Sequence, residues 1–214
     1  MTPGAVVFDF NGTLSDDEPI LYRIFAGLFA EHGRPLTEQK YYDELAGYSD
    51  EEIVYRWLGR DHPAVEEVVA ERIARYRAAV GDGSTIGPEV RAAVRYAAER
   101  VPCAIVSGAA RAEIEPVVRA AGIAPLLEQI VAADDVAKGK PDPEGYLRAL
   151  ELLGGGLRAG QVLVFEDTEA GVAAAKSAGM RCVGLTRTLG AARLAQADEL
   201  LHALDLETMR RLLG

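Results

Sequence analysis

Short apolar runs recur along the chain, each bounded by polar, glycine or proline residues. Many of their residues are β-branched, and such runs are typical of strands buried on both faces of a sheet. We predict strands at Ala5–Phe10, Ala104–Val106, Gln129–Ala132, Val162–Phe165 and Cys182–Leu185.

Between the later strands the apolar positions fall three and four residues apart, which is the spacing of one helix face. Gly122 and Gly154 follow two of these segments and are suited to end a helix. Because strand and helix alternate, the pattern predicts right-handed crossovers and a parallel sheet. The predicted helices are Pro88–Arg100, Arg111–Ala121 and Asp142–Leu153.

The segment between the first two strands, from about residue 16 to residue 81, has only helical patterns. Ser49-Asp50-Glu51-Glu52 forms a capping box that would begin one helix, and Pro63 suits the first turn of another. We predict a core domain of residues 1–15 and 82–214 and a helical domain of residues 16–81. An insert that leaves from the carboxyl end of a strand would cover that end as a cap.

Composition narrows the class of protein. The chain has 214 residues, of which 49% are hydrophobic, so it can bury a sizeable core. Its formal net charge is −10, which disfavours a nucleic-acid partner because phosphate backbones are also negative. An anionic substrate would need local compensation of this charge, and a metal cation is the natural candidate.

Redox and membrane signals are weak. Cys103 and Cys182 lie in predicted strands, so we expect buried, reduced thiols. The three histidines are scattered, which disfavours a zinc site. The apolar runs are far shorter than the ~20 residues of a membrane span. We expect a cytoplasmic monomer that does not bind a membrane.

Polar side chains gather where the predicted strands end. Ligands bind open α/β sheets at the carboxyl ends of their strands, so these residues should meet. Taken alone, each residue has a simpler interpretation. An Asp at the end of a strand often caps a helix or a turn, and Ser107 could cap the helix that begins near Arg111. A lysine in a loop is usually solvated. The residues are Asp9 with Gly12 and Thr13, Ser107 with Gly108, Lys140, and Glu166 with Asp167.

Together these residues predict phosphate chemistry. The carboxylates at 9, 166 and 167 supply the hard oxygen ligands that Mg²⁺ takes. Lys140 could hold both a carboxylate and a phosphoryl oxygen. The other phosphoryl oxygens can be bound by Ser107, by Gly108 at the start of the loop that follows it, and by the amides of Gly12 and Thr13. Asp9 remains free to attack phosphorus.

These motifs resemble those of the haloacid dehalogenase (HAD) superfamily, in its β-phosphoglucomutase-like branch of small phosphatases with a helical cap. They occur in family order: DFNGTL where the family has DxDGT, then IVSG, KGKPDP and VFEDTEAG. The resemblance covers essentially the whole chain. It implies an α/β fold with a doubly wound parallel Rossmann-like core and an inserted all-helical cap.

The resemblance also implies roles for individual residues. Asp9 would be a nucleophile that forms an aspartyl-phosphate, and Ser107 and Lys140 would stabilise the phosphate and its charge. The substrate would be a small phosphorylated metabolite, selected by cap residues around Ala46–Asp50. Mg²⁺ would be held by the Asp9 carboxylate, the Asn11 backbone carbonyl, Asp167 and, directly or through water, Glu166.

One departure bears on catalysis. Asn11 stands where the family has its second aspartate, which protonates the leaving oxygen and deprotonates the attacking water. An amide does neither near pH 7. We therefore expect slow turnover, slowest for alkyl phosphates with basic leaving groups, unless Asp16, Asp17 or Glu18 acts as the missing acid.

Other functions in the superfamily fit less well. A sugar-phosphate mutase would need the histidine and the cap arginine whose positions are taken here by Leu21 and Asp50. A phosphonatase would use a cap lysine, and Lys40 lies in a polar helical stretch typical of a solvated surface. A 2-haloacid dehalogenase lacks the acid pair at 166 and 167.

Asn11 also leaves two interpretations open beside the enzyme. In the first, the protein is a phospho-ligand-binding or regulatory protein that has kept the fold and lost turnover. In the second, Asn11 is a substitution introduced to slow turnover.

Overall fold

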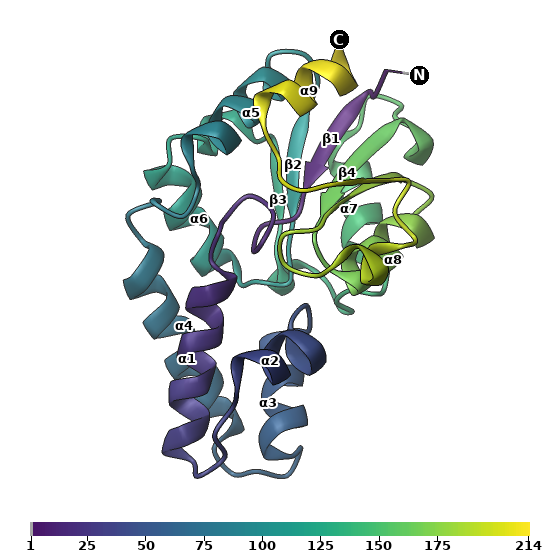
Figure 1. Cartoon of the computed structure of the whole chain (residues 1–214). Helices are drawn as coiled ribbons and strands as arrows, with labels where there is room; N and C mark the ends of the chain where they lie inside the picture. The colour runs from purple at the N-terminus through teal and green to yellow at the C-terminus, as the bar shows by residue number, and fades with distance from the viewer. Residues whose placement is uncertain (1) are drawn as a thin grey trace.

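The computed structural model describes residues 2–214, which contain a six-stranded parallel sheet in the order β3-β2-β1-β4-β5-β6 (Figure 1). The sheet confirms the α/β fold and all five predicted strands, with ends that differ by one or two residues. The strands are β1 Ala5–Phe8, β2 Cys103–Val106, β3 Gln129–Val131, β4 Val162–Glu166, β5 Arg181–Leu185 and β6 Glu199–Leu201.

The strand β6 was not predicted from the sequence. It lies at the edge of the sheet, and its three residues, Glu199, Leu200 and Leu201, include a charge and no β-branched side chain, so it lacks the β-branched apolar pattern of the predicted strands. Its register with β5 pairs Gly184 with Leu200. The sheet is therefore one strand wider than the apolar pattern indicates.

Helices cover both faces of the sheet. Successive side chains of a strand point to opposite faces of the sheet. The first helix layer packs against the β1 side chains on one face, including Phe8, and the second packs against those on the other face, including Val7. The first layer consists of α5 Pro88–Ala98, α6 Arg111–Ala120 and α9 Leu206–Leu213; the second consists of α7 Glu144–Leu153 and α8 Glu169–Ser177. Four short 3₁₀ turns among the described residues are Ala124–Leu126, Ala133–Asp135, Ala159–Gln161 and Ala191–Leu194.

The predicted helix at Asp142–Leu153 begins later than expected. Asp142 lies before the helix, and its carboxylate accepts a hydrogen bond from the Glu144 backbone N–H at 3.0 Å. Pro143 occupies the N-cap position, so the helical ladder starts at Glu144. The helices α8 and α9 were not predicted.

The chain between β1 and α5 is helical, as predicted, and forms a separate lobe at one end of the sheet (Figure 1). Ser49 caps α3, because its hydroxyl accepts from the Glu52 N–H at 3.4 Å. The prediction for Pro63 was wrong. The helix α4 begins at Val65, after a turn in which the His62 side chain accepts from the Ala64 N–H. The elements are α1 Glu18–Glu31, α2 Glu38–Lys40, a π-helical turn at Tyr41–Leu45, α3 Asp50–Leu58 and α4 Val65–Val80.

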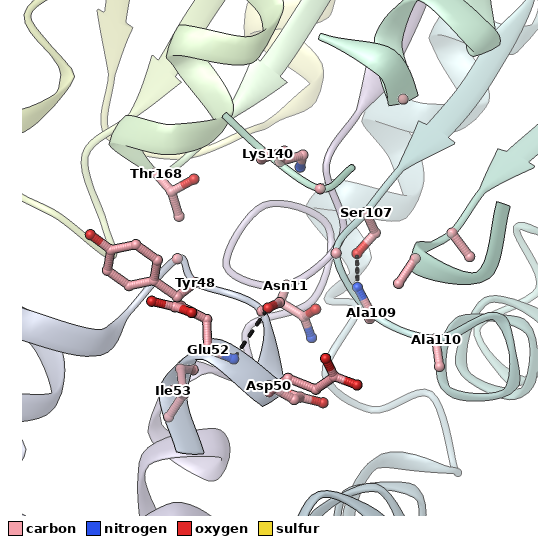
Figure 2. A pocket seen from close by; sticks show the side chains of 18 of the residues that line it. Asn11, Tyr48, Asp50, Glu52, Ile53, Ser107, Ala109, Ala110, Lys140 and Thr168 are labelled. Atoms are coloured by element: carbon pink, nitrogen blue, oxygen red, sulfur yellow. Dashed lines mark hydrogen bonds between the residues drawn. The ribbon is translucent and has the colours of Figure 1, made fainter. Parts of the chain in front are cut away.

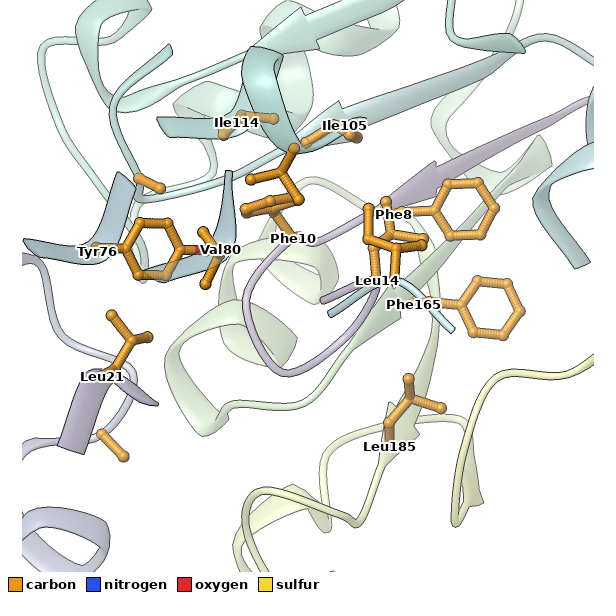
Figure 3. Packing of buried hydrophobic residues seen from close by; sticks show 14 of the residues in the cluster. Phe8, Phe10, Leu14, Leu21, Tyr76, Val80, Ile105, Ile114, Phe165 and Leu185 are labelled. Atoms are coloured by element: carbon orange, nitrogen blue, oxygen red, sulfur yellow. The ribbon is translucent and has the colours of Figure 1, made fainter. Parts of the chain in front are cut away.

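The apolar interior of this lobe is continuous with the core of the sheet. Tyr76 and Val80 of α4 belong to the same buried cluster as Phe10 and Leu14, which follow β1 (Figure 3). Phe8 of β1 stacks on Phe165 of β4, with ring centroids 5.7 Å apart. The loop after β1 is therefore held by the sheet on one side and by α4 on the other.

Two further expectations can be compared with the structure. Cys103 and Cys182 are buried free thiols, as predicted. Within residues 2–214, none of the helices combines the length and the apolar character that crossing a bilayer requires.

Candidate active site

Three parallel strands bring their predicted residues to one edge of the sheet. Asp9 directly follows β1, Ser107 follows β2, and Glu166 ends β4 with Asp167 next in the chain. All four side chains are buried. Because β1 is the central strand from which the chain winds in both directions, this edge is the switch point where open α/β sheets bind ligands.

Lys140 reaches this edge from the loop between β3 and α7 (Figure 2). Its ammonium lies 2.5 Å from Asp9 Oδ1 and 2.5 Å from Glu166 Oε1, and donates to the Val106 carbonyl at 3.1 Å. Burial lowers the pKa of Lys140, but the charges of Asp9 and Glu166 outweigh it and raise the pKa overall. Lys140 is therefore a fixed positive charge between two carboxylates.

Glu166 is held by several donors. The Tyr146 hydroxyl donates to Oε1 at 2.7 Å, and the Asp167 N–H and the Thr168 hydroxyl donate to Oε2 at 3.1 and 3.2 Å. The first turn of α8 passes so close that a Cβ at Gly171 would overlap the Glu166 carboxylate. The residue at 171 must therefore be glycine for this carboxylate to keep its place.

Asp9, Glu166 and Asp167 form a group that can hold a cation. Each offers a carboxylate oxygen, and these oxygens lie within 4.8 Å of one another. Within residues 2–214, Asp167 Oδ2 is buried and has no hydrogen-bond partner, while Oδ1 accepts from the Thr13 hydroxyl at 3.1 Å. An unpaired buried carboxylate oxygen is costly, and a hard cation such as Mg²⁺ is the partner that these oxygens suit.

Burial shifts the pKa values of these acids upward. Burial raises the pKa of Asp9 to about 7, although Lys140 acts in the opposite direction. Burial and the neighbouring charges of Asp9 and Glu166 raise the pKa of Asp167 well above its ordinary value. A cation bound at this group would favour the ionised forms of both acids.

The Asn11-Gly12-Thr13 loop packs against Asp167 and is held by hydrogen bonds of its own. The Gly12 N–H donates within the loop, to the Ser15 carbonyl at 2.8 Å and to Asp17 Oδ1 at 3.2 Å. Among the residues that the structure describes, neither Gly12 nor Thr13 lines the cavity. Gly12 instead has φ +71° and lies so close to Asp167 that a Cβ would overlap its carboxylate. Gly12 and Thr13 therefore lie beside Asp167, and their contact with a phosphate stays a prediction.

Ser107 and Gly108 both line the cavity. The Ser107 hydroxyl oxygen accepts from the Ala109 N–H at 3.0 Å, which leaves its proton to donate to a ligand. Ser107 does not cap the helix near Arg111. The N-cap of α6 is Ala110, whose N–H donates to the Glu113 carboxylate at 3.2 Å.

A cavity of about 630 Å³ opens between the strand ends and the helical lobe. Figure 2 shows Ser107 and Lys140 on one side and the start of α3, with Tyr48 and Asp50, on the other. Four residues of the predicted specificity segment, Gly47–Asp50, lie in its wall. The cavity volume is within the range of pockets that bind small molecules.

The lobe and the core touch around this cavity. Gly47 packs against Thr168, so that a Cβ at 47 would lie 3.0 Å from the threonine side chain. Arg193 donates to the Tyr42 carbonyl at 2.9 Å. Both contacts join the stretch between α2 and α3 to loops of the core.

A buried ion-pair network joins the lobe to the core beside the cavity. Arg72 of α4 pairs with Glu113 of α6, and lies 3.0 Å from Asp50 of α3. Burial raises the pKa of Glu113 to about 7 despite Arg72. No local pattern predicts this network, because its members are up to 63 residues apart and each occupies an ordinary helical position.

Asn11 is tied to two residues that were not predicted to contact it. Its side-chain amide donates to Asp17 Oδ2 at 2.9 Å and to the Tyr76 hydroxyl at 3.1 Å. The Tyr76 hydroxyl also donates to Asp17. Asp17 is fully buried, and burial raises its pKa.

The other two acids of the DDE segment lie in different surroundings. Asp16 is exposed, and Arg187 lies 3.5 Å from its carboxylate. Glu18 is buried and lines the cavity together with Asp9 and Asn11. The Tyr41 hydroxyl donates to Glu18 Oε2 at 3.0 Å.

The structure also locates the residues that bear on the mutase and phosphonatase alternatives. Leu21 and Asp50, at the mutase positions, both line the cavity, and Asp50 is paired with Arg72. Lys40 lies outside this cavity, with its ammonium 5.5 Å from the centroid of the Trp57 ring. The structure therefore places no cap lysine of the described residues beside Asp9 for phosphonatase chemistry.

The fold and this site define a hydrolase. The chain belongs to the haloacid dehalogenase-like hydrolase family, whose model matches residues 3–179. It is 36% identical over 220 residues to validoxylamine A 7'-phosphate phosphatase from Streptomyces hygroscopicus subsp. limoneus, covering 95% of this chain and 94% of the relative. It is 31% identical to a phosphoglycolate phosphatase from Yersinia pseudotuberculosis, covering 85% and 80% of the two chains.

Solved structures agree with this assignment. A CbbY mutant from Rhodobacter sphaeroides, in complex with xylulose-(1,5)bisphosphate, superposes with a TM-score of 0.82 at 26% identity, covering 94% of this chain and 95% of that one. A β-phosphoglucomutase from Clostridium difficile has a TM-score of 0.83 at 20% identity, covering 99% and 97%, and shows that the fold is shared.

Proposed function

We propose that this protein is a Mg²⁺-dependent phosphatase that hydrolyses monoesters of small phosphorylated metabolites through an aspartyl-phosphate on Asp9. The observation that carries the proposal is the buried group of Asp9, Glu166 and Asp167, with its unpaired oxygen, next to Ser107 and Lys140. Relatives that are 36% and 31% identical are named phosphatases, which supports the same reaction class.

In this mechanism a free Asp9 carboxylate oxygen attacks phosphorus, while Lys140 holds the other oxygen. The Ser107 hydroxyl and the Lys140 ammonium donate to phosphoryl oxygens and stabilise their charge. Asp9, Asp167, the Asn11 backbone carbonyl and Glu166 would hold Mg²⁺. A bound Mg²⁺ supplies positive charge that reduces the repulsion between the Asp9 carboxylate and the phosphoryl group.

The substrate is proposed to lie with its phosphate at the strand ends and its remainder against Gly47–Asp50. The relatives named above act, by their names, on validoxylamine A 7'-phosphate and on phosphoglycolate. The cavity has room for a molecule of that size. A sugar-phosphate mutase remains disfavoured by Leu21 and Asp50.

We further propose that residues 16–81 act as a hinged lid whose closure excludes water. Contacts of this lobe with the core at Arg72, Gly47 and Tyr42 support a closed arrangement. Small-angle scattering with and without a phosphate analogue tests the lid. A radius of gyration that stays the same, together with unchanged hydrogen exchange at residues 81–85, would rule the hinge out.

A second candidate function is supported by Asn11 alone: a phospho-ligand-binding protein without turnover. The experiment that separates the two is a phosphatase assay with p-nitrophenyl phosphate, sugar phosphates and nucleotides, with and without Mg²⁺. The enzyme predicts Mg²⁺-dependent release of phosphate that Asp9→Asn abolishes. Tight binding of phosphate with no release from any ester would support the binding protein instead.

A further inference from the structure

Hydrolysis of an alkyl phosphate needs a proton donor, because an alkoxide is a poor leaving group. Asn11 cannot supply a proton near pH 7. Three acids follow it in the chain, Asp16, Asp17 and Glu18. The structure separates these three by where their carboxyl groups lie.

Neither Asp16 nor Asp17 is among the described residues that line the cavity. Asp16 is exposed and faces Arg187. Asp17 is fully buried and already receives hydrogen bonds from the Asn11 amide, the Gly12 N–H and the Tyr76 hydroxyl.

Glu18 is the acid of the three that reaches the cavity. It is the first residue of α1, only 8% exposed, and shares the cavity wall with Asp9 and Asn11. The single hydrogen bond that its side chain makes with the described residues comes from the Tyr41 hydroxyl to Oε2. The other oxygen, Oε1, is left to carry an exchangeable proton.

We propose that Glu18 is the general acid and base of this phosphatase and takes the part that Asn11 cannot play. The proposal rests on the proposed function, since it assumes that Asp9 attacks a phosphate in this cavity. It replaces the expectation of slow turnover for the parent protein. Slow, leaving-group-dependent turnover should instead appear when Glu18 is removed.

The two half-reactions balance as follows. In the first, the bond from Asp9 to phosphorus forms and the bond from phosphorus to the leaving oxygen breaks; the electron pair stays on that oxygen, which takes the proton from Glu18. In the second, water attacks phosphorus and gives a proton to the Glu18 carboxylate. Phosphate leaves, Asp9 is restored, and Glu18 is again protonated.

The surroundings of Glu18 suit this cycle. Burial, and then the charge of Asp17, raises its pKa to about 8, so it begins protonated at neutral pH. The titratable and charged groups that interact with it are Asp17, Tyr41, Asp9, Arg72, Asp167 and Tyr42. Of these, Arg72 favours the ionised form, and the Tyr41 hydrogen bond stabilises the carboxylate that forms after proton transfer.

The same arrangement explains why residue 11 is an amide. Its N–H₂ group supplies a hydrogen bond that the buried Asp17 accepts. An aspartate at 11 would place two carboxylates together, and one would have to bind a proton or be expelled. Asn11 and Asp17 are therefore a matched pair, and Asn11→Asp alone should bring little gain in turnover.

The direct test is Glu18→Gln compared with Asp16→Asn, a neighbouring acid outside the cavity. Turnover is measured with glycerol phosphate as the alkyl ester and p-nitrophenyl phosphate as the aryl ester. Glu18→Gln should lower turnover of the alkyl ester by about 10²–10⁴-fold and of the aryl ester by less than about tenfold. Asp16→Asn should change neither.

Two further readouts separate proton transfer from a structural role. With the alkyl ester, the parent should lose activity above about pH 8, where Glu18 ionises, and Glu18→Gln should lack this limb. The exchange variant Asn11→Asp/Asp17→Asn keeps one amide and one acid but moves the acid to position 11. In that background, Glu18→Gln should cost less than about tenfold.

The possible outcomes are distinct. Equal losses for the alkyl and aryl esters in a Glu18→Gln variant that unfolds at the same urea midpoint as the parent, or an unchanged basic limb in Glu18→Gln, would overturn the role of Glu18. A parent that hydrolyses aryl but not alkyl esters, with no effect of Glu18→Gln, would also overturn the role of Glu18. Asn11 would then slow the reaction with no other acid in its place. Absence of Asp9-dependent turnover with every ester would refute the proposed function itself.

Discussion

Two groups of carboxylates flank the cavity, and they differ in what compensates their charge. Asp9 and Glu166, at the strand ends, share the ammonium of Lys140. Asp17 and Glu18, in the segment that leads into α1, receive hydrogen bonds from neutral groups, among them the Asn11 amide and the Tyr41 hydroxyl. A cation favours the ionised form of an acid, whereas burial without a paired cation favours the protonated form, even though hydrogen-bond donors act against it.

The difference assigns chemistry to acids of the same type. Enzymes that use two carboxyl groups in different roles separate their pKa values through their surroundings. Here the group beside Lys140 suits attack on phosphorus and metal binding, whereas Glu18 suits proton transfer. The following predictions test this division, from the largest expected effect to the smallest.

Removal of Lys140 should have the largest effect. In Lys140→Met, Asp9 and Glu166 would lose their shared cation, and breaking a buried ion pair costs about 3–5 kcal/mol of unfolding free energy. Turnover should also fall by about 10³-fold, the upper range for loss of a charge-stabilising donor. Chemical denaturation in the presence of a chelator, and steady-state assays with Mg²⁺, measure the two effects.

Lys138→Met is the matched control, because Lys138 is exposed and its nearest partner, Asp142, lies 3.9 Å away. It should change stability by less than about 1 kcal/mol. Equal effects of the two substitutions would mean that Lys140 does not compensate the buried acids.

Removal of Arg72 tests the side of the cavity formed by the lobe. Arg72→Met would leave the buried Glu113 without its cation, at an expected cost of about 3 kcal/mol. The exposed Arg75 lies on the same helix and pairs with Glu31 and Glu71. Arg75→Met should cost less than about 1 kcal/mol. Urea unfolding of both variants gives the comparison, and similar midpoints would show that the Arg72 network does not stabilise the fold.

Binding of Mg²⁺ should stabilise the fold, and this effect should depend on the strand-end acids and not on the other acids near the cavity. At a concentration one hundred times its dissociation constant, the ion should add about 2.7 kcal/mol of stability. Asp167→Ala should abolish this gain and Asp16→Ala should keep it. A melting temperature of the parent that millimolar Mg²⁺ leaves unchanged would contradict a metal site at Asp9, Glu166 and Asp167.

The smallest effect concerns the stability of the fold as a function of pH. Burial raises the pKa of Glu18 from 4.5 to about 8. The folded state therefore favours the protonated form of Glu18. The stability that this proton contributes to the fold is complete below pH 4.5 and is lost as the pH rises through 8. Glutamine cannot ionise, so the unfolding free energy of Glu18→Gln should rise relative to that of the parent by at least about 2 kcal/mol between pH 5 and pH 9. Thermal unfolding at the two pH values measures the gain, and a loss at pH 9 would reverse the assignment.

The strand-end group could be predicted from the sequence because each of its residues lies in a short local motif. Asp9, Ser107 and Glu166 end apolar runs, and parallel strands bring such ends together whatever the distance in the chain. Lys140 was found for a similar reason, within KGKPDP. The strand β6 was not predicted because its residues, Glu199, Leu200 and Leu201, contain a charge and no β-branched side chain, unlike the equally short β3 with Ile130 and Val131.

The second group could be predicted only in part. The sequence shows that Asn11 departs from the family and that three acids follow it. It does not show which acid reaches the cavity, since this depends on Tyr76 and Tyr41, which lie 65 residues from Asn11 and 23 residues from Glu18. Contacts over such separations are set by how α1 and α4 pack, and no local pattern encodes them.

The central claim is that Asp9 is phosphorylated during turnover, and it can be tested by trapping that intermediate. The protein is mixed with excess p-nitrophenyl phosphate and Mg²⁺, quenched in acid within one turnover, digested, and analysed by mass spectrometry. The account predicts one phosphoryl group on the peptide that contains Asp9, sensitive to hydroxylamine as an acyl phosphate is, and none in Asp9→Asn. Phosphate on any other residue, or undiminished turnover by Asp9→Asn, would contradict it.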